Sequence, residues 1–441
     1  MSAITPSGID GADIAPDKSI LHRLKNWLAQ NQTSTDDLLA AILRIESISG
    51  REGPLVDFLA AWALQHGLLV DHFELSENDL RGYPQTALPH IPLTGRPTLV
   101  IRFPGHSTGP SLMFNAHSDV ISPGDPAQWK FGPWSGHMAD GCMYGRGACD
   151  VKGPLASALA ALLALRQVYP AGLPGDVLVE IIPGEEDCVG LGTLTSHVRG
   201  YHPDGLIVLE PTEGLPRPAS RGGMRFTIRV RGRAVHGTVK WMGQDAIHAL
   251  KMILDYLAQM EIQFNALNPN VLFSSYPIQR PITVDQIQGA NWQGAICDLA
   301  TCRGYLELLP ADDPAVWKKR FYDQLMELHQ HGSGRGCQLE IEFAEEYGGH
   351  EISTTHKLAL AARHAIQSAG LVTDWPPWAG FNAGCEAGLR WGLEQTPTLV
   401  WGPGSLLQAH GLDEFVPLQA VHEAALAFAL CAIHWTTLRV K

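Results

Sequence analysis

Short apolar segments that recur along the chain constrain its fold more than any other feature. Each of them ends in turn-forming or polar residues, and they read TLVIRF, SLMFNA, VLVEIIP, GLIVLEP and, far downstream, TPTLVWGPG. Strands that are apolar on both faces are typical of a parallel sheet that helices cover on both sides. The sequence therefore predicts an α/β fold whose mostly parallel sheet lies between two layers of helices.

The pattern changes between about Ser220 and Ala344. The run MRFTIRVRGR alternates apolar and charged residues, which indicates a half-exposed strand. Two amphipathic helical patterns and further strand-like runs follow, so the segment has a β-α-β-β-α-β order. TLVWGPG comes after this segment and resembles the first strands. We therefore expect residues 220–345 to form an α+β domain inserted into a first domain, which residues 1–219 and 346–441 form.

The balance of charged residues narrows the range of partners. The 441 residues include 45 Asp and Glu against 32 Lys and Arg, a formal net charge of −13, which offers no electrostatic footprint for nucleic acid or an anionic membrane. The N-terminus has no basic segment followed by an apolar one, and the eight cysteines form no CxxC pairs. The longest apolar stretch, 154–165, is too short to span a bilayer and predicts a core helix. We expect a cytoplasmic protein.

Polar residues follow several of the predicted strands at the point where each strand ends. In open parallel sheets, ligands bind beyond these carboxyl ends. Taken alone, each residue has an ordinary explanation, such as a surface histidine, a helix N-cap or a solvated turn. Together, two histidines and at least three carboxylates at one sheet edge form a ligand set suited to Zn²⁺, Mn²⁺ or Co²⁺. The residues are His117, Asp119, Asp150, Glu185, Glu186, Glu210 and His410.

Six short motifs occur in an order and spacing that carry a resemblance to a known family. They are HSD at 117–119, GRGACDVKG at 145–153, GEED at 184–187, EPT at 210–212, VHG at 235–237 and AHGLDE at 409–414. In this pattern the chain resembles the M20 metallopeptidase and amidohydrolase family over nearly its whole length. The resemblance implies that the first domain is catalytic and that the inserted domain serves as a lid and a dimerisation surface.

The resemblance implies a site for two divalent metal ions, with Zn²⁺ as the first choice and Co²⁺ or Mn²⁺ as alternatives. Asp150 would bridge the two ions. His117 and Glu210 would complete the protein ligands of one ion, and Glu186 and His410 those of the other.

Three further residues receive catalytic roles from the resemblance. Glu185 would act as general base, taking a proton from a metal-activated water and passing it to the leaving amine. Asp119 would hydrogen bond the imidazole of His117 and fix its tautomer. His236 would stabilise the oxyanion, in its own site or in that of a partner subunit, which implies a homodimer formed through the inserted domain.

The implied reaction is cleavage of an amide bond in an N-acyl amino acid or a similar small substrate. A dipeptidase or carboxypeptidase of the same family, acting on short peptides, is the alternative. The chain length and the GYLELLP strand resemble the acetylornithine deacetylase and desuccinylase branch, so we favour deacylation. The segment GFNAGCEAG at 380–388 departs from the family pattern, which indicates an altered pocket. Weaker candidates for substrate contacts are Asn291, Arg303, Gly402 and Gly404.

Two other classes of protein compete with this interpretation. GHSTG at 105–109 fits the pattern of a serine hydrolase, but a nucleophile elbow opens into a helix, and here Pro110 and another strand follow Ser107. A non-catalytic binding relative would have lost Glu185 or several ligands, and none is missing. The run HEISTTH at 350–356 spaces its histidines by six residues, which does not fit a helical zinc motif.

Overall fold

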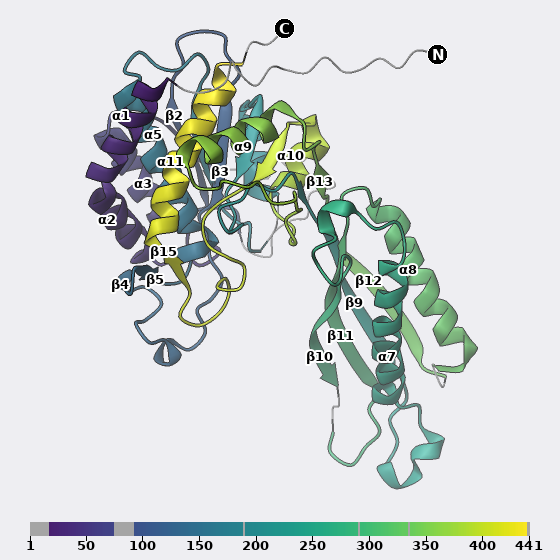
Figure 1. Cartoon of the computed structure of the whole chain (residues 1–441). Coiled ribbons are helices and arrows are strands. Elements are labelled where there is room, and N and C mark those ends of the chain that lie inside the picture. Colours follow the sequence, from purple (N-terminus) through teal and green to yellow (C-terminus); the bar gives the residue numbers. More distant parts are fainter. Residues whose placement is uncertain (1–16, 75–91, 188–189, 290–291, 334–335, 439–441) are drawn as a thin grey trace, which may run out of the picture.

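Two sheets, each with its own apolar core, organise the chain (Figure 1). The computed structural model describes residues 17–74, 92–187, 190–289, 292–333 and 336–438. In Figure 1 the larger sheet and its helices lie at the upper left, and an elongated region with the smaller sheet extends to the lower right. The larger region draws on both ends of the chain, whereas the smaller one is built from the middle of the chain.

The larger sheet is mostly parallel. Its strands are β1 (Leu69–Glu74), β2 (Pro97–Phe103), β3 (Leu112–His117), β6 (Val177–Ile182), β7 (Gly205–Val208) and β14 (Thr398–Val400). They lie in the order β1-β2-β6-β3-β7-β14. β2 pairs antiparallel with β1 and β6, and the other pairs are parallel, so every strand except β2 runs in the same direction. The predicted α/β class with a mostly parallel sheet is confirmed.

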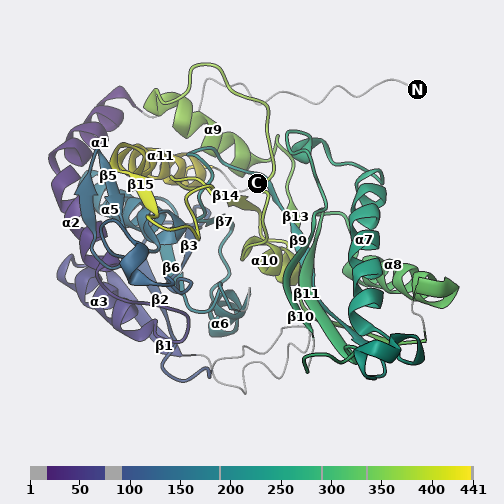
Figure 2. The same ribbon diagram turned by 90° about the horizontal axis from the view of Figure 1, so that it is seen from below.

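Helices cover both faces of this sheet (Figure 2). They are α1 (Lys18–Gln30), α2 (Gln32–Leu43), α3 (Gly53–Gln65), α5 (Gly153–Val168), α6 (Leu191–Arg199), α9 (Lys357–Ala369), α10 (Ala387–Glu394) and α11 (Leu418–Thr436). Successive residues of a strand point to opposite faces. Phe114 of β3 therefore joins the core of α5 and α11, while Met113 joins a second core with Ala387 at the start of α10.

Two of these helices are apolar along most of their length. The span from Ala148 to Val168, which includes α5, and the span of α11 are long and apolar enough to cross a membrane by length and composition alone. In the structure, 94% and 72% of their apolar windows are buried. The predicted core helix at 154–165 lies within α5, in agreement with its expected place against the sheet.

The smaller sheet carries two helices against one face. Its elements are β9 (Gly222–Arg231), α7 (Ala246–Asn265), β10 (Ile282–Gly289), β11 (Leu299–Leu308), α8 (Pro314–Leu328) and β12 (Gln338–Tyr347). The strand order is β10-β11-β9-β12, and all neighbours are antiparallel. Phe226 of β9 packs with Leu257 of α7 and Phe321 of α8. On the opposite face, Arg229 forms an ion pair with Glu342, so the alternation in β9 separates a core face from an exposed one.

The two connections between the regions run side by side. β8 (Ala219–Ser220) pairs antiparallel with β13 (His350–Glu351). His350 is fully buried there, and its Nε2 donates to the carbonyl oxygen of Thr398 at 3.2 Å. Its Nδ1 therefore accepts from the hydroxyl of Ser220, at 2.8 Å. These partners give His350 a structural role at the junction.

A small three-stranded sheet connects two loops that matter for the site below. It consists of β4 (His137–Ala139), β5 (Cys142–Tyr144) and β15 (Phe415–Pro417), in the order β15-β5-β4. β5 precedes the loop of Asp150, and β15 follows the loop of His410. Pairing of Phe415 with Tyr144 thus anchors both loops to each other.

Candidate metal centre

Loops at the carboxyl end of the larger sheet bring the candidate ligands together. His117 ends β3, Asp150 precedes α5, and Glu186, Glu210 and His410 follow β6, β7 and β14. They form two groups, His117–Asp150–Glu210 and Asp150–Glu186–His410. In each group, one side-chain donor atom per residue lies within 4.8 Å of the others. The two groups share Asp150.

The carboxylate of Asp150 lies between two histidines. Its Oδ1 is 3.0 Å from His117 Nε2, and its Oδ2 is 3.3 Å from His410 Nε2. Each oxygen faces a different group of ligands, which is the arrangement that a carboxylate shared by two cations needs. Burial raises the pKa of Asp150, but the hydrogen bonds from His117 and His410 outweigh this effect and hold the pKa well below its usual value.

The main chain holds His117 in one orientation. Its Nδ1 is 2.8 Å from the carbonyl oxygen of Asp119, and since this oxygen only accepts, Nδ1 carries a proton. Nε2, which faces Asp150, is therefore the nitrogen that could act as a ligand. The predicted hydrogen bond between Asp119 and this imidazole is present, and it is made by the main-chain carbonyl oxygen, while Oδ1 of Asp119 lies 3.8 Å from Nδ1.

The carboxylate of Asp119 instead holds the paired glutamates. It accepts hydrogen bonds from the backbone N–H groups of Glu185 and Glu186, both at 3.1 Å. The turn that precedes them contains Gly184 with a φ of 78°, a conformation that glycine adopts without strain. Both glutamates thus lie beyond the end of β6, where side chains no longer alternate between the two faces of the sheet. The charges of both interact with His117.

Burial and mutual repulsion act on the carboxylates of the cluster. Burial raises the pKa of Glu210 well above its usual range, and the charge of Asp150 adds to this shift. Burial also raises the pKa of Glu185; the charge of His117 opposes this shift, and Glu210 adds to it. Cations relieve such repulsion, and two imidazoles with three carboxylates are donors that Zn²⁺, Co²⁺ and Mn²⁺ accept. The residues present therefore fit two divalent ions.

His410 completes the second group from an exposed loop. Its side chain is 51% exposed, and its Nε2 lies 3.2 Å from the carboxylate of Glu186. Its backbone has a φ of 62°, in the left-handed region. Hydrogen bonds to Asp150 and Glu186 raise the pKa of His410 to about 11. The second group is thus open to solvent on the side of His410.

Glu414, in the AHGLDE motif, has a role that was not predicted from the sequence. Its buried carboxylate accepts from the backbone N–H groups of Gly147 and Asp150 at 3.0 and 3.2 Å. Arg146 donates to the same carboxylate at 2.8 Å and balances its charge. The loop that carries His410 therefore also fixes the loop that carries Asp150.

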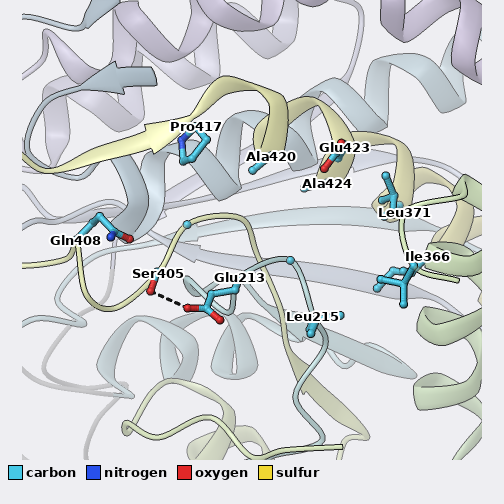
Figure 3. Close-up of a pocket in the computed structure, with 14 residues that line it drawn as sticks. Glu213, Leu215, Ile366, Leu371, Ser405, Gln408, Pro417, Ala420, Glu423 and Ala424 are labelled. Carbon is cyan, nitrogen blue, oxygen red and sulfur yellow. Dashed lines mark hydrogen bonds between the residues drawn. The ribbon is translucent and has the colours of Figure 1, made fainter. Parts of the chain in front are cut away.

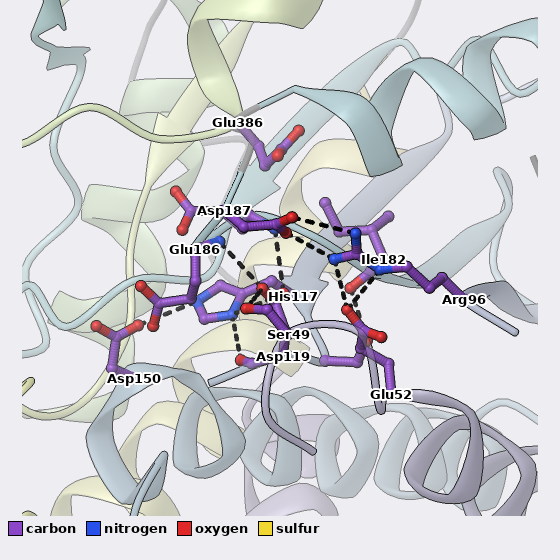
Figure 4. Close-up of polar contacts among 12 residues, drawn as sticks. Ser49, Glu52, Arg96, His117, Asp119, Asp150, Ile182, Glu186, Asp187 and Glu386 are labelled. Atoms are coloured by element: carbon purple, nitrogen blue, oxygen red, sulfur yellow. Dashed lines mark hydrogen bonds and ion pairs between the residues drawn. The ribbon is translucent and has the colours of Figure 1, made fainter. Parts of the chain in front are cut away.

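A buried ion network, also missed, supports the turn of the paired glutamates. Figure 4 shows Arg96 between the carboxylates of Glu52 and Asp187. Its Nη2 is 2.7 Å from Glu52 Oε1 and 2.6 Å from Asp187 Oδ1, and the guanidinium is almost fully buried. A Cβ at Gly184 would lie 2.8 Å from the same Nη2. Glycine is therefore required for this close approach, and Arg96 fixes the end of the GEED motif through Asp187.

Gly402 and Gly404 allow close packing within the protein. A Cβ at Gly402 would lie 2.6 Å from the carbonyl oxygen of Glu210. One at Gly404, whose φ is 91°, would lie 2.7 Å from the Cβ of Cys149. The loop after β14 thus packs against the segments that carry two candidate ligands, Glu210 and Asp150.

The remaining candidates lie elsewhere. His236 is exposed in the smaller region, where its Nδ1 is 2.7 Å from the hydroxyl of Thr238. Arg303 is an exposed residue of β11, and no contact among the described residues joins it or His236 to the cluster. Asn291 lies outside the described residues. Ser107 is exposed in a turn between β2 and β3 with no helix after it, so it lacks the context of a nucleophile elbow.

A separate cavity of about 410 Å³ lies next to the loops of Glu210 and His410 (Figure 3). Its walls include Ser405, which donates to Glu213 at 3.0 Å, and apolar residues of α9 and α11. None of the five candidate ligands is among the described residues that line it. The cavity is therefore distinct from the metal cluster.

The mostly parallel sheet, the smaller antiparallel sheet and the shared Asp150 together define an α/β protein with two adjoining groups of candidate metal ligands. The sequence profile of Peptidase family M20/M25/M40 matches residues 113–434. The chain belongs to this family, whose members are metal-dependent hydrolases of amide bonds.

Two relatives are similar in sequence. A succinyl-diaminopimelate desuccinylase of Methylorubrum populi is 29% identical over 261 residues, which cover 56% of this chain and 63% of the relative. The chain thus spans less than two thirds of the length of that relative. An acetylornithine deacetylase of Salmonella paratyphi B is 24% identical over 376 residues, which cover 84% of this chain and 88% of the relative.

Two solved structures share the fold. Human carnosine dipeptidase 1 has a TM-score of 0.73 at 16% identity, covering 96% of this chain and 100% of that chain. A Bacillus subtilis protein described as a dinuclear metal-binding peptidase from the M20 family has a TM-score of 0.60 at 17% identity, covering 95% of this chain and 98% of that chain.

Proposed function

We propose that the chain cleaves the amide bond of an N-acyl amino acid or a similar small substrate with the aid of two divalent metal ions. The observation that carries the proposal is the carboxylate of Asp150, whose two oxygens face the histidines of two different ligand groups. If these carboxylates belonged only to solvated acidic turns, nothing would require the two oxygens of Asp150 to face two different histidines. Two relatives are named for the removal of succinyl and acetyl groups, which supports deacylation over peptide cleavage.

The residues divide the work between the two groups. His117, Glu210 and one oxygen of Asp150 would hold one ion, and Glu186, His410 and the other oxygen would hold the second. When bound, ions in such a pair lower the pKa of a water molecule and polarise the scissile carbonyl. Zn²⁺ suits these donors best, with Co²⁺ or Mn²⁺ as alternatives.

Glu185 moves the proton. Its carboxylate takes a proton from the attacking water and delivers it to the nitrogen of the leaving amine, so that amide and water become carboxylate and amine. Asp119 holds the backbone N–H groups of Glu185 and Glu186 and thereby keeps the base beside a ligand. Arg96 fixes Asp187 at the end of the same turn. These contacts set the position of the base before the substrate arrives.

His236 acts, in this proposal, on the substrate of a partner subunit in a homodimer formed through the smaller region. Its exposure and its lack of a described contact with the cluster of its own chain support this role. Trp241 and Trp292 of the same region are 75% and 80% exposed, and large exposed apolar side chains favour an interface.

Chains with His236→Ala and chains with Glu185→Gln should each be inactive, and mixing them should restore activity. Mixed dimers without activity would contradict the shared site.

A substrate panel tests the reaction. N-acetyl and N-succinyl amino acids and dipeptides should be offered to protein supplied with Zn²⁺, Co²⁺ or Mn²⁺. We expect turnover of N-acyl amino acids that 1,10-phenanthroline abolishes and a serine-directed inhibitor leaves intact. Turnover of dipeptides alone would move the function to a dipeptidase, and activity that withstands the chelator would remove the metal mechanism.

Glu185→Gln tests the base. We expect kcat to fall by about 10²- to 10⁴-fold while metal content stays at the wild-type level, because the amide keeps the shape and loses the proton acceptor. Glu213→Gln is the matched control, since Glu213 lies near Glu210 in sequence but contacts Ser405 outside the cluster. Turnover of Glu185→Gln within tenfold of wild type would exclude Glu185 as the base.

A further inference from the structure

Helices α6 and α10 form a pair whose first ends lie near the metal cluster. The backbone N–H of Gly190, just before α6, donates to Glu386 Oε1, just before α10, at 2.7 Å. Leu191 and Leu194 of α6 pack against leucines of α10. The pair is parallel, because the opposite ends of the two helices also meet. α6 begins shortly after the paired glutamates in the sequence.

Three metal-binding side chains meet at the other end of this pair. His202 Nδ1 is 2.7 Å from Glu394 Oε2, and His197 Nδ1 is 3.5 Å from the same oxygen. The two imidazole rings are 4.8 Å apart and nearly perpendicular. His197 lies in the last turn of α6, Glu394 ends α10, and His202 lies in the loop after α6. One donor atom from each residue lies within 4.8 Å of the others.

Arg390 orients the carboxylate of this group. Its Nη1 donates to Glu394 Oε1 at 2.8 Å and to the carbonyl oxygen of Tyr201, next to His202, also at 2.8 Å. Its Nη2 donates to Ser196 Oγ at 2.6 Å, next to His197. The guanidinium thus binds one carboxylate oxygen of Glu394, and the other oxygen faces both histidines. It also connects Tyr201 and Ser196, which precede His202 and His197 in the sequence, to α10. Hydrogen-bonded support of a ligating carboxylate is usual in metal sites.

We propose that His197, His202 and Glu394 bind a divalent metal ion of the zinc class, separate from the cluster around Asp150. Ligand bonds of about 2.0–2.2 Å in tetrahedral geometry place donor atoms about 3.4 Å apart. The 3.5 Å between His197 Nδ1 and Glu394 Oε2 matches this separation, and the 2.7 Å contact between His202 Nδ1 and the same oxygen is a hydrogen bond that the ion would replace. His202 is exposed, so water completes the coordination. The ion joins the C-terminal ends of α6 and α10, which otherwise depend on Arg390. Binding to the folded state alone stabilises the protein.

Zn²⁺ stoichiometry tests the site without reference to activity. Full-length protein, His202→Ala and Glu394→Gln should be dialysed to equilibrium against the same Zn²⁺ concentration, and bound zinc measured by mass spectrometry. We expect each variant to hold one Zn²⁺ fewer per chain than wild type. Gln keeps an oxygen for Arg390 while removing the charge, so folding is preserved. His22→Ala, an exposed histidine on α1, is the matched control and should hold the wild-type amount.

Thermal unfolding gives a second readout. Zn²⁺ added beyond the amount that fills the cluster should raise the midpoint of wild type and of His22→Ala, and leave His202→Ala and Glu394→Gln unchanged. Equal zinc content in wild type and both site variants would overturn the proposal. An equal loss in His22→Ala would overturn it too, because the extra zinc would then bind surface histidines without selectivity.

Discussion

The two histidines of the metal cluster, His117 and His410, are held in opposite ways. The side chain of His117 is 2% exposed, lies at the end of a core strand and is oriented by a main-chain carbonyl. The side chain of His410 is 51% exposed, lies on a loop and is held by the carboxylates of Asp150 and Glu186. One half of the cluster is therefore part of the folded core, whereas the other half is attached to its surface.

A ligand can contribute to the stability of the fold and to metal binding, and the two histidines differ in these contributions. A buried ligand compensates the charge of its neighbours whether or not metal is bound, so the fold depends on it. An exposed ligand contributes to metal binding, but water replaces it at small cost to the fold. Substitutions compared in metal-free protein therefore report the first role, and metal content reports the second.

His117→Ala should have the largest effect on stability. Removal of the imidazole takes from the buried carboxylates of Asp150 and Glu210 the cation that interacts with both, and leaves Asp150 with His410 alone of its two histidines. Loss of one member of a buried pair costs up to about 5 kcal/mol. We expect a decrease of this size in the free energy of unfolding of metal-free protein, measured in urea. A decrease below that of His410→Ala would reverse the comparison.

Arg96→Met should come next, at about 3–4 kcal/mol, because it leaves the carboxylate of Glu52 buried without a partner. The side chain of Asp187 is 14% exposed, so water partly solvates its charge and the loss of Arg96 destabilises it less. The double variant Arg96→Met/Glu52→Gln should regain part of the lost stability. If the double variant were no more stable than the single one, the unpaired charge of Glu52 would not be the cause of the loss.

His350 shows how burial shifts the pKa of a histidine when burial is the main influence on it. Hydrogen bonding and charge from Asp150 outweigh burial and raise the pKa of His117, whereas burial lowers the pKa of His350 to about 4. The unfolded chain binds a proton near pH 6.5 and the folded chain does not, so stability is complete above pH 6.5 and falls as pH drops toward 4. We expect His350 to contribute about 2–3 kcal/mol to this loss.

The control for this pH effect is His350→Gln, which cannot titrate. Its free energy of unfolding should depend less steeply on pH between 6.5 and 4 than that of wild type, with both measured in urea at a series of pH values. Parallel curves would show that other groups cause the loss.

His410→Ala should have the smallest effect on the fold. Partly exposed ion pairs contribute about 0.2–1 kcal/mol, so metal-free protein should lose no more than this in its free energy of unfolding. Metal content, by contrast, should fall by about one ion per chain after dialysis. Full retention of metal would show that Glu186 and Asp150 suffice for the second ion.

The residues that end strands could be predicted from the sequence, and those that act between distant loops could not. The ends of β3, β6 and β7 follow from apolar runs that stop at polar residues, and parallel strands bring such ends to one edge. The role of Glu414 depends on hydrogen bonds to a loop 264 to 267 residues away in the chain. Arg96 meets Asp187 across 91 residues. Neither contact leaves a periodic pattern in the sequence.

The orientation of elements was harder to predict than their existence. The run that became β2 was identified as a strand, but its antiparallel direction depends on its neighbours, β1 and β6, and on no feature of its own residues. Asp119 was predicted to hydrogen bond the imidazole of His117, and its main-chain carbonyl oxygen does so. The contact of its side chain was not predicted. Its carboxylate is engaged by two backbone N–H groups of the glutamate turn, which only the folded chain brings within reach.

The pairing of β8 with β13 makes the smaller region a module. Ser220 and His350 are opposite residues of neighbouring strands, so the chain leaves the larger region and returns to it at nearly the same place. A turn of a few residues could close this gap with little loss of entropy, and insertions between such neighbouring points are well tolerated. During evolution, the smaller region could therefore be exchanged for another without breaking a strand of the sheet that carries the chemistry.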